Sequence, residues 1–399
     1  MKRLPLAVLV GTHLVNDFYG GAVAAMVPFF VLERHYTYAA ATGLMLAATF
    51  ASTLIQPAFG VLTDRHRLGW LVSGGMLVCG LGVSAAGVPH GYVLTWLAIA
   101  VSGVGSAAFH PEASRATRSI AGASAIGMSI FSVGGNIGMA VAPVTVAAVL
   151  AATTLSGSPA LVVPAVLMAA AGMLLPRLAG RAGLAGRAAV PQERPEPTAP
   201  AARPPQPARR DDWRMFGWLA GAVIALSIAL VGLRSFLPLY LIQRFGVSPV
   251  VGSAALTVAV GVGVSGTLLG GVLADRWGRV PTVRLGYALT GPALVGLVLA
   301  PTLPIAFAAA VVLGVALYLP FSIHVTLGQE YLPNRVGTAA GLTLGMSISA
   351  GGLASPLLGA LADAHGVAAA LLVLAGLALL ALLLSTRFHE TRERAAARA

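Results

Sequence analysis

The chain is a series of long apolar stretches separated by short polar or Pro/Gly-rich turns. Most stretches are about as long as the roughly 20 residues that a helix needs to cross the hydrocarbon core of a bilayer. Charged residues, Pro and Gly mark the ends of the stretches. The pattern predicts twelve transmembrane helices, at about residues 5–32, 38–62, 69–88, 92–113, 122–150, 159–178, 214–242, 248–274, 279–300, 303–325, 335–362 and 366–386.

Landmarks in the first half of the chain recur in the second half at nearly one offset. The run Gly60-Val-Leu-Thr-Asp64-Arg65 is matched 211 residues later by Gly271-Val-Leu-Ala-Asp275-Arg276. Other pairs lie 213 or 214 residues apart, in the same order: His110 and His324, Gly127 and Gly341, Pro143 and Pro356. Because many transporters are built from internal repeats, we predict an all-α membrane protein of two six-helix repeats that rock about a central site.

Residues 179–212 interrupt this pattern with seven prolines among Ala, Arg and Glu. Such a composition buries too little apolar surface to fold, so it predicts a flexible cytoplasmic linker. Binding of anionic lipid or a partner through its arginines is the alternative. The predicted organisation is an N-terminal bundle (1–178), the linker (179–212), a C-terminal bundle (213–390) and a cytoplasmic tail (391–399).

Composition and charge support a membrane protein. Hydrophobic residues make up 57% of the chain and charged residues 10%, whereas soluble domains carry about 25% charged residues. If the N-terminus is cytoplasmic, 22 of the 25 Lys and Arg residues fall in cytoplasmic segments and two in outer loops. This positive-inside bias predicts that both termini are cytoplasmic, and it explains the net charge of +12 without a nucleic-acid partner.

Several alternative interpretations are disfavoured. The first stretch is too long and too polar for a cleaved signal peptide. The single cysteine, Cys79, allows no intrachain disulfide or cysteine metal site. The glycines of Gly261–Gly266 match a dinucleotide fingerprint, but they lie in an apolar helix and predict packing instead. No catalytic set, metal cluster or phosphate loop converges, so the chain is not predicted to be an enzyme and needs no metal or cofactor.

Ionisable residues inside predicted helices are the candidate functional residues, because each costs about 2.5–3.5 kcal/mol at a helix centre. In the first helix, His13 and Asp17 are four residues apart and share a face. Low-dielectric surroundings disfavour a charged carboxylate, so Asp17 is the predicted proton carrier, supported by His13. A structural hydrogen-bonding role is the alternative. Asn16 and Tyr19, beside Asp17, are predicted to line the substrate cavity.

The fourth helix carries His110-Pro111-Glu112. Pro111 removes a backbone donor and bends the helix, and broken helices of transporters line cavities. His110 is therefore predicted to bind substrate or relay a proton. Glu112 is a second candidate for proton coupling, although pairing with Arg115 would make it structural.

In the second half, Arg234 is the one cation deep within a predicted span. A guanidinium stays charged and binds phosphate or carboxylate through two donors, so Arg234 needs an anion, either an acidic side chain (Asp17, Glu112 or Glu330) or the substrate. For Glu330, near a helix end, a solvated or paired role is favoured. Asn136 and His324 are predicted to line the same cavity.

The two Asp-Arg turns are predicted to form a cytoplasmic latch. Each Asp can cap a helix N-terminus or pair with an arginine, and glycines four residues apart let helices approach closely. A simple stop-transfer turn is the alternative. The latch residues are Gly60, Asp64, Arg65, Gly271, Asp275, Arg276 and Arg279, and further glycine pairs are Gly134 with Gly138, Gly266 with Gly270, and Gly337 with Gly341 and Gly345.

Gly271-Val-Leu-Ala-Asp275-Arg276-Trp277-Gly278-Arg279 resembles the signature loop of the major facilitator superfamily. The runs His13-Leu-Val-Asn16-Asp17, Phe109-His110-Pro111-Glu112-Ala113, Ser129–Asn136 and Arg335–Leu342 resemble its fosmidomycin-resistance branch. The resemblance covers essentially all twelve helices. It implies a bacterial inner-membrane exporter driven by proton antiport, with a phosphonate antibiotic as the substrate that gives the branch its name.

We therefore predict a proton-coupled efflux transporter for small polar or anionic molecules that works by alternating access. Its expected partners are the solute, protons and membrane lipids, and it is expected to function as a monomer. One alternative is an importer or uniporter of a sugar or organic acid on the same fold. Another is a membrane receptor or scaffold that transports nothing.

Overall fold

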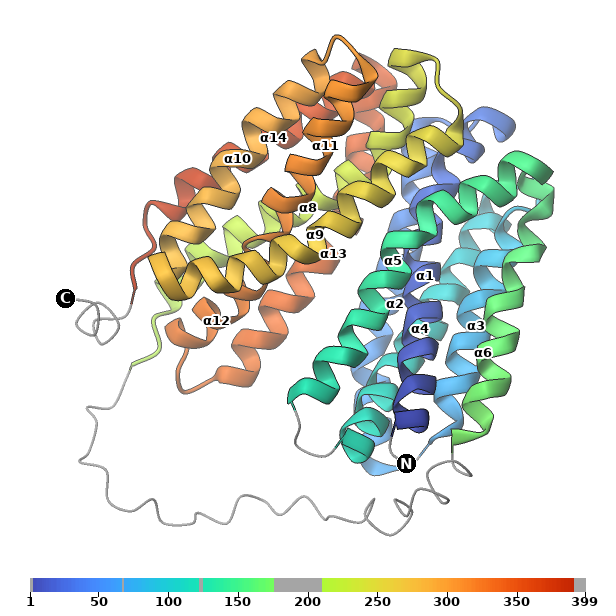
Figure 1. Cartoon of the computed structure of the whole chain (residues 1–399), viewed down its shortest axis with the longest axis horizontal. Coiled ribbons are helices and arrows are strands. Elements are labelled where there is room, and N and C mark those ends of the chain that lie inside the picture. Colours follow the sequence, from blue (N-terminus) through green and yellow to red (C-terminus); the bar gives the residue numbers. More distant parts are fainter. Residues whose placement is uncertain (1–2, 67, 122–124, 176–209, 391–399) are drawn as a thin grey trace.

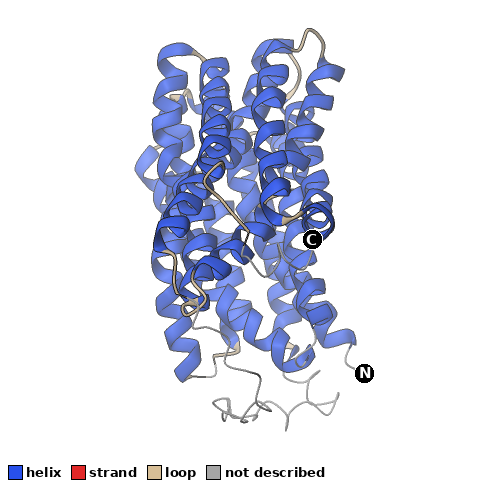
Figure 2. Cartoon of the chain, turned by 90° about the vertical axis from the view of Figure 1, so that its left-hand side faces the viewer, coloured by secondary structure: helices blue, strands red, loops and turns tan. Residues whose placement is uncertain are grey.

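The computed structural model describes residues 3–66, 68–121, 125–175 and 210–390. Within these ranges the chain is helical and has no strand (Figure 2). Nearly all of the predicted linker and the predicted tail lie outside them. The first half comprises α1 (Arg3–Arg34), α2 (Tyr38–Arg65), α3 (Trp70–Ala86), α4 (Tyr92–Ala121), α5 (Ala125–Thr153), the 3₁₀ helix η1 (Leu155–Val162) and α6 (Val163–Met173). The second half comprises α8 (Trp213–Phe245), α9 (Pro249–Trp277), α10 (Arg279–Leu299), α11 (Leu303–Tyr318), α12 (Phe321–Tyr331), α13 (Val336–His365) and α14 (Val367–Ser385).

The helices follow the predicted apolar stretches. Among the described residues, ten helical segments are long and apolar enough to cross a membrane. The apolar helix α3 has 17 residues, and α13 occupies the predicted stretch at 335–362. The all-helical membrane fold is confirmed, whereas the count of twelve spans and the two-repeat arrangement remain predictions.

The two halves lie side by side (Figure 1). In the first half α1 packs on α5 and α3 on α4, and in the second half α8 packs on α14 and α9 on α11. The halves contact each other mainly through α2 with α13 and α5 with α9. We call the end at which α1 ends and α2 begins the distal end, and the end that holds the N-terminus the proximal end.

Hydrogen bonds between the halves gather toward the distal end. Thr42 Oγ1, in the second turn of α2, donates to Ser355 O of α13 over 2.9 Å. Further along α2, Ser349 Oγ donates to Thr53 Oγ1 over 3.2 Å. In this conformation these cross-half hydrogen bonds hold α2 and α13 together from the distal end to about the middle of the two helices.

Polar residues define where several helices start. Thr37 Oγ1 accepts from the Ala40 N–H over 3.1 Å and caps α2. Asp212 Oδ1 accepts from the Met215 N–H over 2.9 Å and caps α8. Each cap satisfies a backbone donor that the first turn of a helix leaves without an intrahelical partner.

Glycines allow close contacts inside each half. A Cβ at Gly138 of α5 would lie 1.9 Å from Leu14 O of α1, and one at Gly270 would lie 2.1 Å from Leu319 O. The small-residue spacing thus marks close helix contacts at these positions, as expected. Other glycines differ, because no atom of another described segment lies within 4 Å of the Cβ position of Gly60, Gly271, Gly337, Gly341 or Gly345. For these five, the expectation of close helix contact is wrong in this conformation.

Replacing Gly138 by Ala should destabilise the fold, because the new methyl group would meet the backbone of α1 rather than a movable side chain. Overpacking of this kind costs about 1–3 kcal/mol. We expect the melting temperature of the purified protein, followed by tryptophan fluorescence, to fall by several degrees. The control is Gly217→Ala, at an open position in α8, which should leave it unchanged. Equal melting temperatures for all three proteins would contradict the close α1–α5 contact.

Candidate functional site: a carboxylate between two histidines

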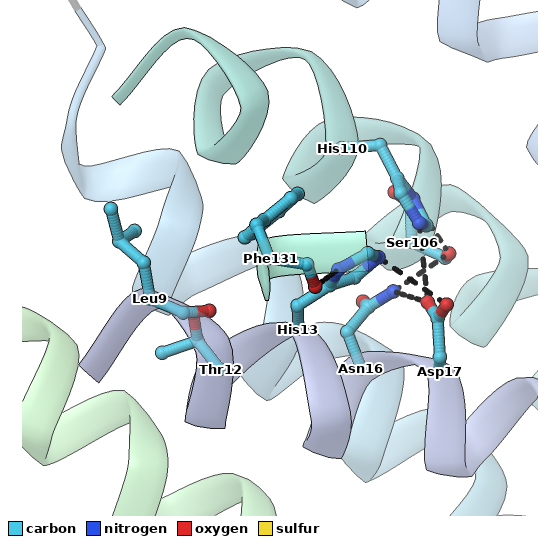
Figure 3. Close-up of polar contacts among 8 residues, drawn as sticks. All are labelled: Leu9, Thr12, His13, Asn16, Asp17, Ser106, His110 and Phe131. Carbon is cyan, nitrogen blue, oxygen red and sulfur yellow. Dashed lines mark hydrogen bonds and ion pairs between the residues drawn. The ribbon is translucent and has the colours of Figure 1, made fainter. Parts of the chain in front are cut away.

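Polar side chains of α1 and α4 converge inside the first half (Figure 3). Asp17 Oδ1 lies 3.2 Å from His110 Nε2, and Asp17 Oδ2 lies 3.3 Å from His13 Nε2. Asn16 Nδ2 donates to Asp17 Oδ1 over 3.1 Å and to Ser106 Oγ over 3.2 Å. We call these five residues the Asp17 cluster. The structure thus joins His13, Asn16, Asp17 and His110, all of which the sequence predicts to be functional.

The second ring nitrogen of each histidine fixes which atom carries hydrogen. His13 Nδ1 lies 2.8 Å from Phe131 O, and His110 Nδ1 lies 2.9 Å from Ser106 O. A carbonyl oxygen can only accept a hydrogen bond, so we assign both Nδ1 atoms as donors. His110 Nδ1 also lies 3.3 Å from Ser106 Oγ, and we give the shorter carbonyl contact priority. In a neutral imidazole the other nitrogen is then an acceptor. Each Nε2 would therefore turn a lone pair toward Asp17 unless a further proton is present.

The geometry therefore determines how many protons the cluster needs. Each of the two contacts to Asp17 requires one hydrogen, and an acidic Asp17 can supply only one of them. Two protons satisfy both contacts, either as two imidazolium rings with a carboxylate or as one imidazolium ring with a protonated Asp17. Both arrangements carry one net positive charge. With one proton fewer, one nitrogen lone pair faces a carboxyl oxygen, and that contact becomes repulsive.

The members of the cluster differ in how deeply they are enclosed. Side-chain exposure is 10% for His13, 18% for Asp17 and 29% for His110. The His13 ring stacks on Phe131 with the ring centres 4.0 Å apart. A Cβ at Gly135 would lie 2.4 Å from Asp17 Oδ2, so a residue without a side chain is required there. His110 is thus the member of this histidine–aspartate triad with the largest exposed fraction.

The same three residues are a place where the described chain could hold a metal ion, since ligand atoms of His13, Asp17 and His110 lie within 4.8 Å of one another. Their separations of 3.2 and 3.3 Å are also hydrogen-bond lengths. Bridging protons satisfy these contacts without an ion. The contacts are thus compatible with a hydrogen-bonded cluster of two histidines and one carboxyl group.

Arg234 lies apart from the Asp17 cluster, at the surface between the halves. Its guanidinium donates to Tyr318 Oη, and its Cζ lies 5.9 Å from the centre of the Tyr318 ring. Its Nε is buried and has no hydrogen-bond partner. Arg234 lines a cavity of about 20 Å³, which has room for about one water molecule, together with Gly20 and Gly21 of α1 and with residues of α2, α5 and α9.

Other predicted cavity residues lie elsewhere. Tyr19 is fully buried, and its hydroxyl donates to Leu161 O over 2.7 Å, which ties α1 to η1. His324 is buried inside the second half, where its Nε2 lies 2.7 Å from Tyr287 Oη. Asn136 is exposed on α5 rather than enclosed with the Asp17 cluster. In this conformation Tyr19 and His324 make internal helix contacts and do not face a common cavity with Arg234.

The predicted acidic alternatives are paired. Glu112 is buried and accepts from Arg115 Nε over 2.9 Å. Glu330 pairs with Arg279 of the predicted latch, within the second half. Of the other latch residues, Arg65 and Arg276 are exposed, and the side chain of Asp64 lies outside the described residues. Gly60 and Gly271 face open space, as described above.

Four residues of these sites were not singled out from the sequence. Ser106, Phe131 and Gly135 complete the surroundings of Asp17, and Tyr318 holds Arg234. Ser106 and Gly135 adjoin or lie within the motifs that carry the family resemblance, and this was the available signal. Nothing in the local pattern around Tyr318 distinguishes it from a packing residue.

The fold and the buried charged site define a membrane transporter, and comparison with known proteins identifies its family. The protein-family model described as Major Facilitator Superfamily matches residues 9–356 of this chain. The chain therefore belongs to this superfamily, and it is a multi-pass transporter rather than an enzyme. It is 31% identical over 373 residues to the fosmidomycin resistance protein of Escherichia coli (strain K12), covering 88% of this chain and 84% of that protein. It belongs to the fosmidomycin-resistance-type branch.

A second relative is the uncharacterized MFS-type transporter YfnC of Bacillus subtilis (strain 168), 27% identical over 399 residues, which cover 95% of this chain and 91% of that protein. Solved structures support the fold. A bacterial homologue of the human lysosomal transporter Spinster, inward-facing and occupied, matches with a TM-score of 0.76 at 16% identity, over 96% of this chain and 95% of that one. The nucleoside transporter NupG matches with a TM-score of 0.76 at 13% identity, over 97% and 100%.

The pairing of Glu112 with Arg115 can be tested by a double-mutant cycle. Arg115→Ala should destabilise the protein by about 2 kcal/mol, because it leaves a buried carboxylate without its partner while the arginine itself is partly exposed. Adding Glu112→Gln should recover most of this loss. The measurement is thermal unfolding of the two single variants and the double variant. Additive effects would show that the two side chains do not depend on each other.

Proposed function

We propose that the chain is a proton-coupled efflux antiporter of the bacterial inner membrane. It exports small anionic or polar molecules, phosphonate-type antibiotics among them, by alternating access. The observation that carries the proposal is the Asp17 cluster, in which two histidines address the two oxygens of one carboxyl group. Ionisable groups are costly inside a membrane-spanning helix. A protein that only scaffolds a membrane complex would bear this cost without a functional gain.

Proton binding at this cluster is linked to helix packing. His110 connects α4 to α1, and His13 connects α1 to the backbone of α5. Loss of one of the two bridging protons turns one attractive contact into a repulsive one. A proton can therefore favour one arrangement of α1, α4 and α5 over another, which is the differential interaction that conformational coupling requires.

Arg234 supports an anionic solute. Of its candidate partners, Glu112 is paired with Arg115, Glu330 with Arg279, and Asp17 with the two histidines. Tyr318, which accepts from Arg234, offers a hydroxyl group and not a carboxylate. A part-buried guanidinium whose Nε is buried without a partner, and which has no countercharge, favours an oxyanion as its ligand. The cavity beside it is too small for a drug in this conformation, so we propose that it widens when the halves rearrange.

The remaining assignments follow from topology. With both termini cytoplasmic, the distal end faces outward, and the conformation described here is closed on that side. The predicted latch residues Asp64, Arg65, Asp275 and Arg276 would then act at the proximal end when it closes. Gly60 and Gly271, which face open space here, would meet neighbouring helices in that second state. We propose that one chain suffices for transport.

An importer or uniporter of a sugar or organic acid on the same fold is the alternative function. The name of the Escherichia coli relative, a fosmidomycin resistance protein, favours export. The two are separated by comparing cells with and without the protein. An exporter lowers the growth inhibition caused by its solute, whereas loss of an importer starves cells that depend on the solute.

Asp17→Asn should abolish transport driven by a proton gradient, because an amide cannot bind and release the coupled proton. Proteoliposomes with fosmidomycin as the probe solute should show gradient-driven flux for the unchanged protein and background flux for the variant. Exchange of labelled for unlabelled solute without a gradient should persist, since it requires no net proton movement.

The matched control for this experiment is Asp211→Asn, the same substitution at a residue that pairs with Arg335 at the proximal end. It should transport normally. Full gradient-driven flux by Asp17→Asn would move proton coupling to another residue. Flux of the unchanged protein that is indifferent to the gradient would refute proton coupling altogether.

Arg234→Gln should weaken recognition of anions. Loss of a charge-assisted hydrogen bond of about 1.5–3 kcal/mol corresponds to a roughly ten- to hundredfold rise in KM for fosmidomycin. Tyr318→Phe keeps the charge but removes the acceptor that holds the guanidinium, so its KM should rise less, with little change in kcat. Unchanged KM in Arg234→Gln would exclude Arg234 from substrate binding while leaving the proton-coupling proposal intact.

A further inference from the structure

The first turn of α2 is held by the opposite half of the protein. Asp363, near the end of α13, lies 325 residues along the chain from Tyr38. Its Oδ1 accepts from the Tyr38 N–H over 2.7 Å, and its Oδ2 accepts from the Ala39 N–H over 2.9 Å. Tyr38 Oη in turn accepts a hydrogen bond from Gln243 of α8. One carboxylate thus binds two consecutive backbone donors across the interface.

These contacts complete a helix cap that is shared between the halves. The first backbone N–H groups of a helix have no partner within it. In α2, Thr37 satisfies the Ala40 N–H from within the first half, while Asp363 satisfies the two preceding donors from the second half. A negative charge is stabilising at this position because the helix N-terminus carries partial positive charge. Asp363 therefore contributes both hydrogen bonds and charge to the closed interface.

Glycines of α13 allow the approach that this cap requires. A Cβ at Gly359, one turn before Asp363, would lie 2.5 Å from Ala39 Cα and 2.4 Å from Thr42 Oγ1. A Cβ at Gly352, further along the same interface, would lie 1.9 Å from Thr49 Oγ1. Neither close contact would survive separation of α2 from α13. The close contacts of Gly352 and Gly359 with α2 and the cap at Asp363 consequently form and break together.

We propose that Asp363 is a clasp that stabilises the conformation closed at the distal end and must release α2 before that end can open. The clasp goes beyond the proposed function, because it depends neither on the proton site nor on the identity of the solute. Its release is easily reversible. Asp363 and Tyr38 are not buried, so water can replace the lost hydrogen bonds, and the clasp biases the equilibrium instead of locking it.

The experiment measures how far apart the two halves lie at the distal end. Spin labels are attached at Ser156→Cys, in η1, and Thr302→Cys, between α10 and α11, which are both exposed. The native Cys79 is buried, so we expect the label to attach only to the two introduced cysteines. Distances are measured by double electron–electron resonance in lipid nanodiscs, without solute and at one pH. The unchanged protein should be dominated by the shorter distance.

Asp363→Ala should raise the ratio of long to short distances roughly five- to tenfold, as expected for loss of a helix cap. Asp363→Asn should have a smaller effect, because it keeps one acceptor oxygen but loses the charge. Thr42→Val, which removes the hydrogen bond to Ser355 O, should shift the ratio in the same direction and tests the same interface by a second route.

The matched control is Asp212→Ala, which removes a carboxylate cap of similar geometry from α8 but lies wholly within the second half. It should leave the distance distribution unchanged. The proposal is overturned if Asp363→Ala gives the unchanged distribution, whatever Thr42→Val does, or if Asp212→Ala shifts it equally. Transport is not the readout, so this outcome is independent of proton coupling and of the substrate.

Discussion

A carboxyl group kept inside a membrane bundle has to be neutralised, and in this transporter two histidines share that task. Each histidine uses one ring nitrogen to bind a backbone carbonyl, which leaves the other to face Asp17. The arrangement is complete only when two protons are present. The electrostatics of the first half therefore depend on how many protons these three side chains hold, and the contact between α1 and α4 runs through the same atoms.

The two halves divide the chemistry between them. The first half holds the titratable cluster, whereas the second half supplies Arg234, a permanent cation at the interface. These sites come from different helices, the cluster from α1 and α4 and Arg234 from α8. Glycines let helices of the same half pack backbone against backbone. The contact of Gly138 with Leu14, for example, holds α5 closely against α1 inside the first half. The open positions at Gly60 and Gly271 leave room for a different contact at the proximal end.

The cross-half contacts suggest why this conformation is stable. At the distal end, α13 both packs against α2 and caps its first turn. The helix N-terminus supplies donors that need partners, and an acidic side chain of the opposite half supplies the acceptor. The interface therefore includes exposed polar contacts, those of Asp363, that water can replace.

Much of this protein could be derived from its sequence, because the relevant signals are local. Apolar stretches of membrane-spanning length located the helices, and the four-residue spacing of His13 and Asp17 placed both on one face of α1. The similarity of short motifs pointed to the correct family. Partners could not be derived in this way. Only the packing of α4 and α5 on α1 brought His110, Ser106 and the Phe131 carbonyl to Asp17.

Tertiary structure also decided which charged residues are free to act. It paired Glu112 with Arg115, left Arg234 without an acid, and set Tyr19 and His324 into internal contacts. The Gly359–Asp363 segment reads in sequence as an ordinary helix end, and its role at α2 emerges only when the halves meet. The physical reason is one of range. Helix formation in a membrane is set by residues a few positions apart, whereas hydrogen-bond and charge partners are chosen by packing between segments up to 325 residues apart.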